Sequence, residues 1–132
     1  MTKLLVLTLL AAACGKSNDK PGPPYTGPLT LERIRTQEPR ADNRGAVQVC
    51  DETWEVSFAR LQAVLGPPTA VEGAYQVWYA AEGDRCAIYK AEKGECPPSW
   101  NKPGDRLAMT AFGEHAKGDS PYDDCVAKAP KR

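Results

Sequence analysis

The sequence predicts a small α+β domain that is braced by disulfide bonds. Its 132 residues suffice for one modest domain, and its 12 prolines and 11 glycines are too many for a helical bundle or coiled coil. One segment has apolar residues at helical spacing, and three later segments alternate at strand spacing. We therefore expect one or two short helices packed on a three-stranded antiparallel meander.

The N-terminus has the pattern of an export signal. Lys3 is followed by an apolar run over residues 4–13 and then by Cys14. A positive start, a short apolar run and small residues before a break are typical of a secretory signal peptide. A membrane-spanning helix needs about 20 residues, which this run does not reach. A buried N-terminal helix is the alternative, although the run has no polar face.

The residues around Cys14 resemble the lipobox of bacterial lipoproteins. They read Leu-Leu-Ala-Ala-Ala-Cys-Gly, with Ala11 where the family usually has leucine. The resemblance implies that residues 1–13 are a lipoprotein signal peptide and that Cys14 carries lipid, including acyl chains such as palmitate. Because Gly15 is not an aspartate, the resemblance also implies an outer-membrane location, facing the periplasm or the exterior. Ordinary signal cleavage after Ala13 is the alternative.

Residues 14–28 are expected to form the lipidated cysteine and a tether. This stretch is rich in proline and glycine and has almost no apolar side chains. Such a composition buries too little surface to offset the entropy cost of ordering the chain. An extended tether at roughly 3 Å per residue would hold the domain up to about 40 Å from the membrane.

The cysteine count predicts two disulfide bonds. With Cys14 carrying lipid, an even number of cysteines remains for the exported domain, namely Cys50, Cys86, Cys96 and Cys125. None of them forms a Cys-x-x-Cys pair, which argues against a zinc ribbon or a thioredoxin-like redox site. Three connectivities are open, and we favour Cys86–Cys96 with Cys50–Cys125.

The folded domain is expected over residues 29–125 and begins with a short helix. Thr30 is suited to cap that helix, and Pro39 ends it. Leu31 and Ile34 are its only apolar residues that share a face. The helix is therefore predicted to be marginal.

A short extended segment at residues 47–49 precedes the main predicted helix. Its apolar stripe consists of Trp54, Phe58, Leu61 and Leu65, with Val64 alongside, and either Asp51 or Ser57 could cap its start. Gly66 stands where a C-terminal cap belongs, and Pro67 prevents continuation. This stripe is most simply explained as core.

Three strands follow, each with apolar or aromatic residues in alternation, at residues 75–80, 86–90 and 106–112. Turns are predicted at residues 82–84 and 92–95, and a proline-rich loop at residues 96–104. From Gly113 the chain is polar, and Cys125 alone suggests a fixed point. We therefore expect residues 126–132 to be a polar tail.

The order of features in residues 57–90 resembles the SmpA/OmlA (BamE-like) domain of outer-membrane lipoproteins. These features are a short helix, the stop Leu-Gly-Pro-Pro-Thr at residues 65–69, an aromatic strand containing Trp78 and Tyr79, and a hairpin with glycine. Family members pair helices with a three-stranded antiparallel sheet, and the founding member assists β-barrel assembly without catalysis. The resemblance implies fold and compartment, and the four domain cysteines depart from the family.

Composition argues against several classes of function. The chain has 17 basic and 17 acidic residues, so it lacks the positive charge that nucleic-acid binding requires. His115 is the only histidine, and Asp123 with Asp124 does not make a metal cage. No serine lies in a nucleophile-elbow motif. We therefore predict neither an enzyme nor a cofactor or metal site.

Trp100 is the strongest candidate for contact with a partner. It follows Cys96 in a proline-rich loop, and Tyr75 and Tyr79, or Trp78 on the opposite strand face, would extend its surface. The alternative is that Trp100 folds back onto the core. The prediction is a lipid-anchored envelope protein, attached to the membrane by its lipid. Its non-catalytic domain binds an envelope protein and acts in outer-membrane assembly or maintenance. An anchored or secreted enzyme inhibitor that presents the loop from Cys96 to Trp100 is the alternative function.

Overall fold

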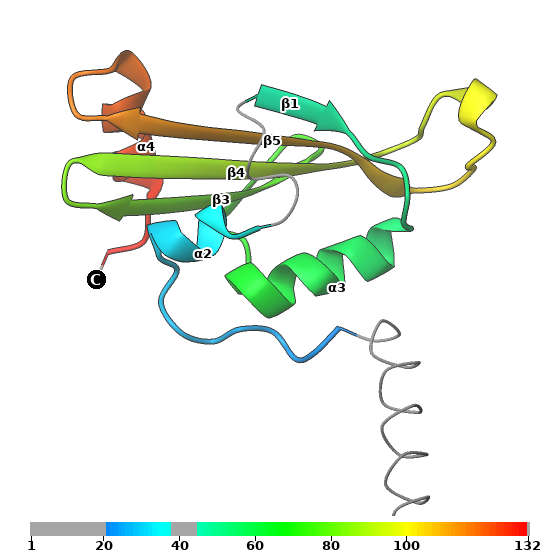
Figure 1. Cartoon of the computed structure of the whole chain (residues 1–132), viewed down its shortest axis with the longest axis horizontal. Coiled ribbons are helices and arrows are strands. Elements are labelled where there is room, and N and C mark those ends of the chain that lie inside the picture. The colour runs from blue at the N-terminus through cyan, green and yellow to red at the C-terminus, as the bar shows by residue number, and fades with distance from the viewer. Residues whose placement is uncertain (1–20, 38–44, 132) are drawn as a thin grey trace, which may run out of the picture.

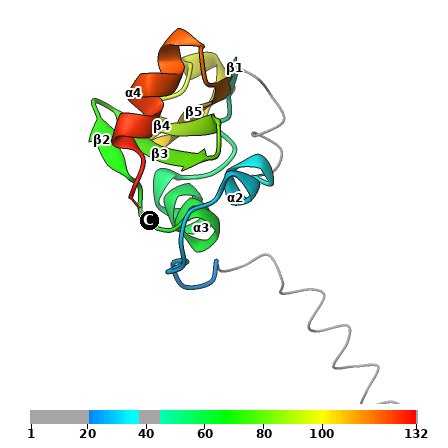
Figure 2. The ribbon, with the colours of Figure 1, turned by 90° about the vertical axis from the view of Figure 1, so that its left-hand side faces the viewer.

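The computed structural model describes residues 21–37 and 45–131. Over these residues, one antiparallel sheet has five strands in the order β1-β5-β4-β3-β2. Helices α2 and α3 lie on one face of the sheet and α4 on the other (Figures 1 and 2). The α+β class is confirmed. The predicted signal peptide, the lipidated Cys14 and the helix stop at Pro39 lie outside the described residues.

The two predicted helices form where the sequence placed them. In α2 (Leu31–Arg35) the Thr30 hydroxyl accepts a hydrogen bond from the Arg33 N–H at 3.1 Å, as expected of an N-cap. Thr53 precedes α3 (Trp54–Leu65) at the N-cap position, so the predicted caps Asp51 and Ser57 are wrong. The helix ends at Gly66, whose φ of 78° is a conformation that favours glycine.

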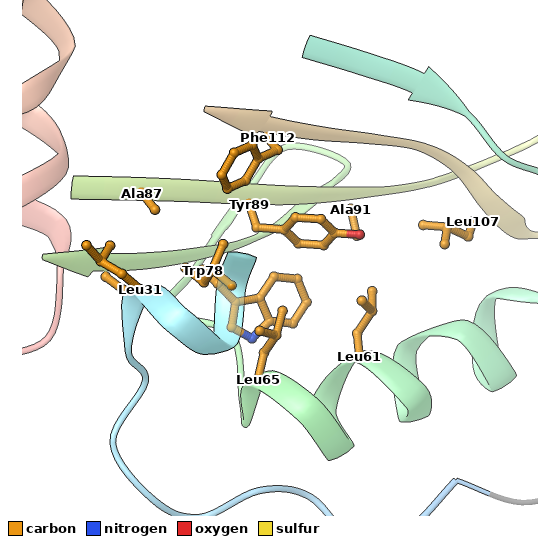
Figure 3. Packing of buried hydrophobic residues seen from close by; sticks show 11 residues of the cluster. Leu31, Leu61, Leu65, Trp78, Ala87, Tyr89, Ala91, Leu107 and Phe112 are labelled. Carbon is orange, nitrogen blue, oxygen red and sulfur yellow. The ribbon is translucent and has the colours of Figure 1, made fainter. Parts of the chain in front are cut away.

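The main hydrophobic core fills the space between these helices and the sheet. Trp78 is fully buried, and its ring centroid lies 6.0 Å from that of Tyr89 and 6.5 Å from that of Phe58. Figure 3 shows Trp78 and Tyr89 reaching from the sheet toward Leu61 and Leu65 of α3. Each such buried side chain stabilises the fold by about 1.5–3 kcal/mol relative to exposure. The helical stripe is therefore core, as predicted.

The sheet is larger than the predicted three-stranded meander. Its strands are β1 (Gly45–Gln48), β2 (Ala70–Glu72), β3 (Tyr75–Glu82), β4 (Arg85–Gly94) and β5 (Arg106–Ala116). The expected meander corresponds to β3, β4 and β5, and a short strand pairs with each side of it. The predicted turn at residues 92–95 is wrong because β4 continues through it to Gly94, with a register shift after Glu92.

Helix α4 (Ser120–Lys128) occupies the segment where only Cys125 suggested a fixed point, and it continues into the expected polar tail. Tyr122, Cys125 and Ala129 face the sheet and pack on Val77 and Tyr79 in a second buried cluster. Their spacing of three and four residues is helical, but the stripe is one residue wide. Most residues of this segment are polar, so the sequence pattern did not predict the helix.

The disulfide bonds join Cys50 to Cys96 and Cys86 to Cys125. Two bonds are confirmed, and the favoured connectivity is wrong. Cys86 lies near the start of β4 and Cys96 follows its end, so an extended strand at roughly 3.3 Å per residue separates them by about 30 Å. A disulfide requires Cα atoms about 4.4–6.8 Å apart. The favoured pairing assumed a turn where β4 continues.

The segment before α2 packs on α3. The Tyr25 N–H donates to the Gln62 carbonyl at 2.9 Å, and the Arg33 guanidinium lies 3.5 Å from the centre of the Tyr25 ring. A Cβ on Gly66 would stand 2.9 Å from the Tyr25 carbonyl oxygen, so this close approach requires glycine. The ordered domain therefore includes Tyr25, within the expected tether over residues 14–28.

Candidate binding loop

Residues 95–105, which we call the tryptophan loop, connect β4 to β5 and project from one end of the sheet (yellow to orange, right of Figure 1). The loop contains a short 3-10 helix, η2 (Pro98–Trp100). Trp100 is 41 % exposed and is one of a small set of large hydrophobic side chains exposed among the described residues. It does not fold back onto the core.

Both ends of the tryptophan loop are fixed to neighbouring segments. Cys96 is bonded to Cys50, which is 1 % exposed and precedes α3. At the other end, the Asp105 carbonyl accepts a hydrogen bond from the Trp54 N–H at 3.0 Å. The loop is therefore anchored to the segment before α3 on one side of its tip and to the first residue of α3 on the other.

Local hydrogen bonds shape the tip. The Trp100 N–H donates to the Pro97 carbonyl and the Asn101 N–H to the Pro98 carbonyl, each at 3.0 Å. Asn101 has φ 54°, a left-handed conformation that asparagine tolerates better than most residues. Prolines at three loop positions also restrict the unfolded chain, so ordering the loop costs less entropy.

The loop encloses a shallow cavity of about 230 Å³. Its lining consists of Glu95, Cys96, Pro97, Pro98, Asn101, Lys102 and Pro103. One acidic and one basic side chain balance there, and Lys93 and Asp105 form an exposed ion pair at 3.6 Å beside it. The site therefore presents aromatic, proline and peptide surface with little net charge.

Of the two tyrosines that were expected to extend the surface, Tyr79 is buried and Tyr75 is only partly exposed. Tyr79 is 2 % exposed beneath α4, and its hydroxyl donates to the Glu72 carboxylate. Burial and this carboxylate raise the Tyr79 pKa to about 12. Tyr75 is half-buried, with the Lys90 ammonium 5.4 Å from its ring centre. Tyr79 is therefore a core residue, like Trp78, and Trp100 is the most exposed of the predicted aromatic residues.

A charged cluster that the sequence did not indicate lies at the other end of the sheet. Glu114 of β5 accepts two hydrogen bonds from Arg35 of α2, at 2.8 and 2.6 Å, and one from Arg85 of β4 at 2.9 Å. The hydrogen bonds from Arg35, followed by those from Arg85, lower the Glu114 pKa to about 2. These ion pairs join α2 to β4 and β5, so the cluster is explained by its structural role.

His115 lies half-buried near the end of β5, beside a shallow cavity of about 250 Å³ that also touches Ile88 and Lys90. Within residues 21–37 and 45–131, no three histidine, cysteine, aspartate or glutamate side chains gather in a way that would hold a metal ion.

The helices in the described part of the chain are too short, or too polar, to cross a membrane. Comparison with known proteins finds no matching family model and no significant match among curated proteins or solved structures. The resemblance of residues 57–90 to the SmpA/OmlA domain therefore stays a prediction.

Proposed function

We propose that this chain is a lipid-anchored cell-envelope lipoprotein whose domain binds a protein partner without catalysis, through the tryptophan loop. One observation carries the proposal: Trp100 is 41 % exposed on a loop that the Cys50–Cys96 bond anchors. Exposing an indole to water is unfavourable, and a partner that covers it gains apolar burial.

The exposed tryptophan and the preformed conformation of the loop both favour binding. Tryptophan is enriched among the few interface residues that contribute most to affinity. A side chain presented by a preformed loop loses little conformational freedom on association, which leaves more of the contact energy as affinity. The near-neutral surroundings of Trp100 favour a partner with an apolar recess over a strongly charged one.

The test compares two exposed apolar residues at different edges of the domain. Trp100→Ala removes the indole, whereas Val71→Ala shortens a valine of β2 that is 65 % exposed. Both changes are at the surface and should leave the melting temperature nearly unchanged. Crosslinking in intact cells followed by mass spectrometry should recover a partner with wild type and Val71→Ala, and lose it with Trp100→Ala. Equal recovery with both variants would refute the proposal.

The membrane anchor belongs to the same proposal and rests on the lipobox resemblance at Cys14. A single acyl chain attaches a protein reversibly, and several chains on one residue make attachment stable. Metabolic labelling with palmitate should mark the wild-type chain and not Cys14→Ser. If the label persists in Cys14→Ser, the proposed lipid anchor at Cys14 is refuted, and the proposal for the tryptophan loop is not affected.

The inhibitor alternative is favoured by the projection of the tryptophan loop beyond the end of the sheet. A braced, protruding loop suits insertion into the cleft of a hydrolase. An inhibitor should bind one soluble hydrolase at equal stoichiometry, whereas a factor in outer-membrane assembly or maintenance should co-purify with β-barrel proteins. The identity of the crosslinked partner therefore separates the two functions.

A further inference from the structure

The second half of β3 has an open hydrogen-bonding edge. Strand β2 pairs only with the first half, where the Thr69 N–H donates to the Val77 carbonyl at 2.8 Å. The Tyr79 N–H is satisfied by the Thr69 hydroxyl at 3.1 Å. Backbone groups along a strand alternate in direction, so the Tyr79 carbonyl and both backbone groups of Ala81 point outward on this side. Nothing in the described residues pairs with them.

The sequence explains why β2 stops short. The antiparallel register pairs Val77 with Ala70, so the residues that would continue the ladder past Thr69 are Pro67 and Pro68. Proline has no N–H to donate, so Pro68, which the register places opposite Tyr79, cannot complete a backbone pair there. The two prolines that end α3 therefore also leave the edge at Ala81 without a neighbour from β2.

A cavity of about 330 Å³ lies at this edge. Its lining consists of Pro28, Leu29, Ala80, Ala81, Pro130 and Lys131. The segment before α2 and the segment after α4 converge there, beside the end of β3 (Figure 1). Ala80 belongs to the core under α2 and Ala81 flanks the cluster under α4, so the cavity spans both faces of the sheet.

We propose that this edge binds an extended peptide segment by strand addition, antiparallel to β3 and in line with β2. One outward N–H and two outward carbonyls at strand spacing are complementary to another extended backbone. Both flanks are mainly apolar, and a strand covered on both faces is apolar at successive positions. The occupant is therefore a segment with consecutive small or β-branched apolar residues. This site is separate from the tryptophan loop and does not depend on its function.

The test uses the whole chain in detergent micelles and a fluorescent acetylated, amidated peptide, Lys-Thr-Val-Ile-Val-Thr-Lys. Binding should slow hydrogen exchange at the Ala81 amide. Ala81→Pro removes the outward N–H and puts its ring in the place of the incoming strand. It should weaken binding by about tenfold or more, since a hydrogen bond is lost and a clash added. Anisotropy of the peptide measures the affinity.

The matched control is Val71→Pro, because the register of β2 also directs the Val71 N–H outward, at the outer edge of β2. Binding should be unchanged in this variant. A loss with Val71→Pro and none with Ala81→Pro would place the peptide on the outer edge of β2 and overturn the assignment. A peptide-independent dimer that protects Ala81, detected by light scattering, would also overturn it, because a second copy would then be the occupant.

Two methylated peptides keep the proposal testable if Ala81→Pro does not fold. One peptide carries N-methyl groups on every second amide, and the other carries them on the remaining amides. In a bound strand, one of these two sets of amides faces β3 and the other faces solvent. One of the two complementary methylated peptides should bind like the parent and the other should bind at least about tenfold more weakly. Equal behaviour of the two peptides would refute strand addition.

Discussion

At the scale of single residues, Glu114 of β5 links three elements of the fold through its ion pairs with α2 and β4. Its side chain is 5 % exposed, and hydrogen bonds from Arg35 and Arg85 surround its carboxylate. A buried carboxylate is costly unless it is paired, so the two arginines stabilise the ionised form and tie α2 to the sheet. No local pattern in the sequence announces this cluster, because its members come from three separate elements.

The Glu114 pKa predicts how stability depends on pH. It lies at about 2, below the ordinary value of 4.5, so the stabilisation is complete above about pH 4.5 and is lost as the pH falls toward 2. Glu114→Gln should cost about 1–3 kcal/mol at pH 7, because both arginines lose a charged acceptor. It should also flatten the decline of stability in acid. Urea unfolding at a series of pH values measures both effects.

Glu95→Gln is the control for this prediction, since Glu95 is exposed on the tryptophan loop. Its unfolding free energy should follow the wild-type pH profile. Should Glu114→Gln also follow that profile, the cluster does not stabilise the fold in the way described.

At the scale of elements, each disulfide bond holds one segment in place. Cys86–Cys125 joins α4 to β4, and Cys50–Cys96 joins the tryptophan loop to the segment before α3. Helix α4 has nine residues, and a helix of this length is marginal on its own, so its packing on the sheet and its bond hold it together. The two bonds therefore have separate structural effects, which can be measured separately.

Removing each bond by paired serine substitutions should destabilise the domain by about 2–4 kcal/mol. Loss of Cys86–Cys125 should raise hydrogen exchange in α4 and expose Tyr79. Loss of Cys50–Cys96 should raise exchange in the tryptophan loop and leave α4 protected. Hydrogen-exchange mass spectrometry distinguishes these outcomes, and identical exchange patterns in the two variants would contradict the separation. Peptide mapping of unreduced protein provides an independent check of the connectivity.

The elements differ in how well the sequence predicts them. Helix α3 was predictable because its stripe spans three turns and ends in Gly66 and Pro67. Strand β2 has three residues, too few for a period to be visible. The charged residues near the end of β4 were read as a turn, although the strand continues to Gly94. The predicted disulfide connectivity was wrong for the same reason, because it required that turn. For the candidate site, the sequence indicated Trp100 but not the burial of Tyr79, which depends on α4.

At the scale of the whole molecule, helices cover both faces of the sheet. The segment before α2 packs on one of these helices, α3. Tyr25 connects to α3 through a backbone hydrogen bond to Gln62 and through the Arg33 guanidinium on its ring. These contacts hold the segment before α2 against α3.

Tyr25→Ala should release this segment with little effect on the rest of the fold. The ring contact with Arg33 is worth about 0.5–1 kcal/mol at an exposed site, so unfolding should change by a similar amount. Limited proteolysis should then cut the segment ahead of α2 faster than in wild type. Tyr25→Phe keeps the ring and should restore resistance, and equal cleavage of the two variants would contradict the role of the ring.

The contact at Tyr25 also limits the reach of the molecule under the proposed anchor. Ten residues then separate Cys14 from Tyr25, and at roughly 3 Å each they allow about 30 Å of travel from the lipid. Tyr25 packs near the last turn of α3, whereas the tryptophan loop is fixed at the first. A partner in the same membrane would meet Trp100 at an effective concentration in the millimolar range, at which weak contacts are occupied.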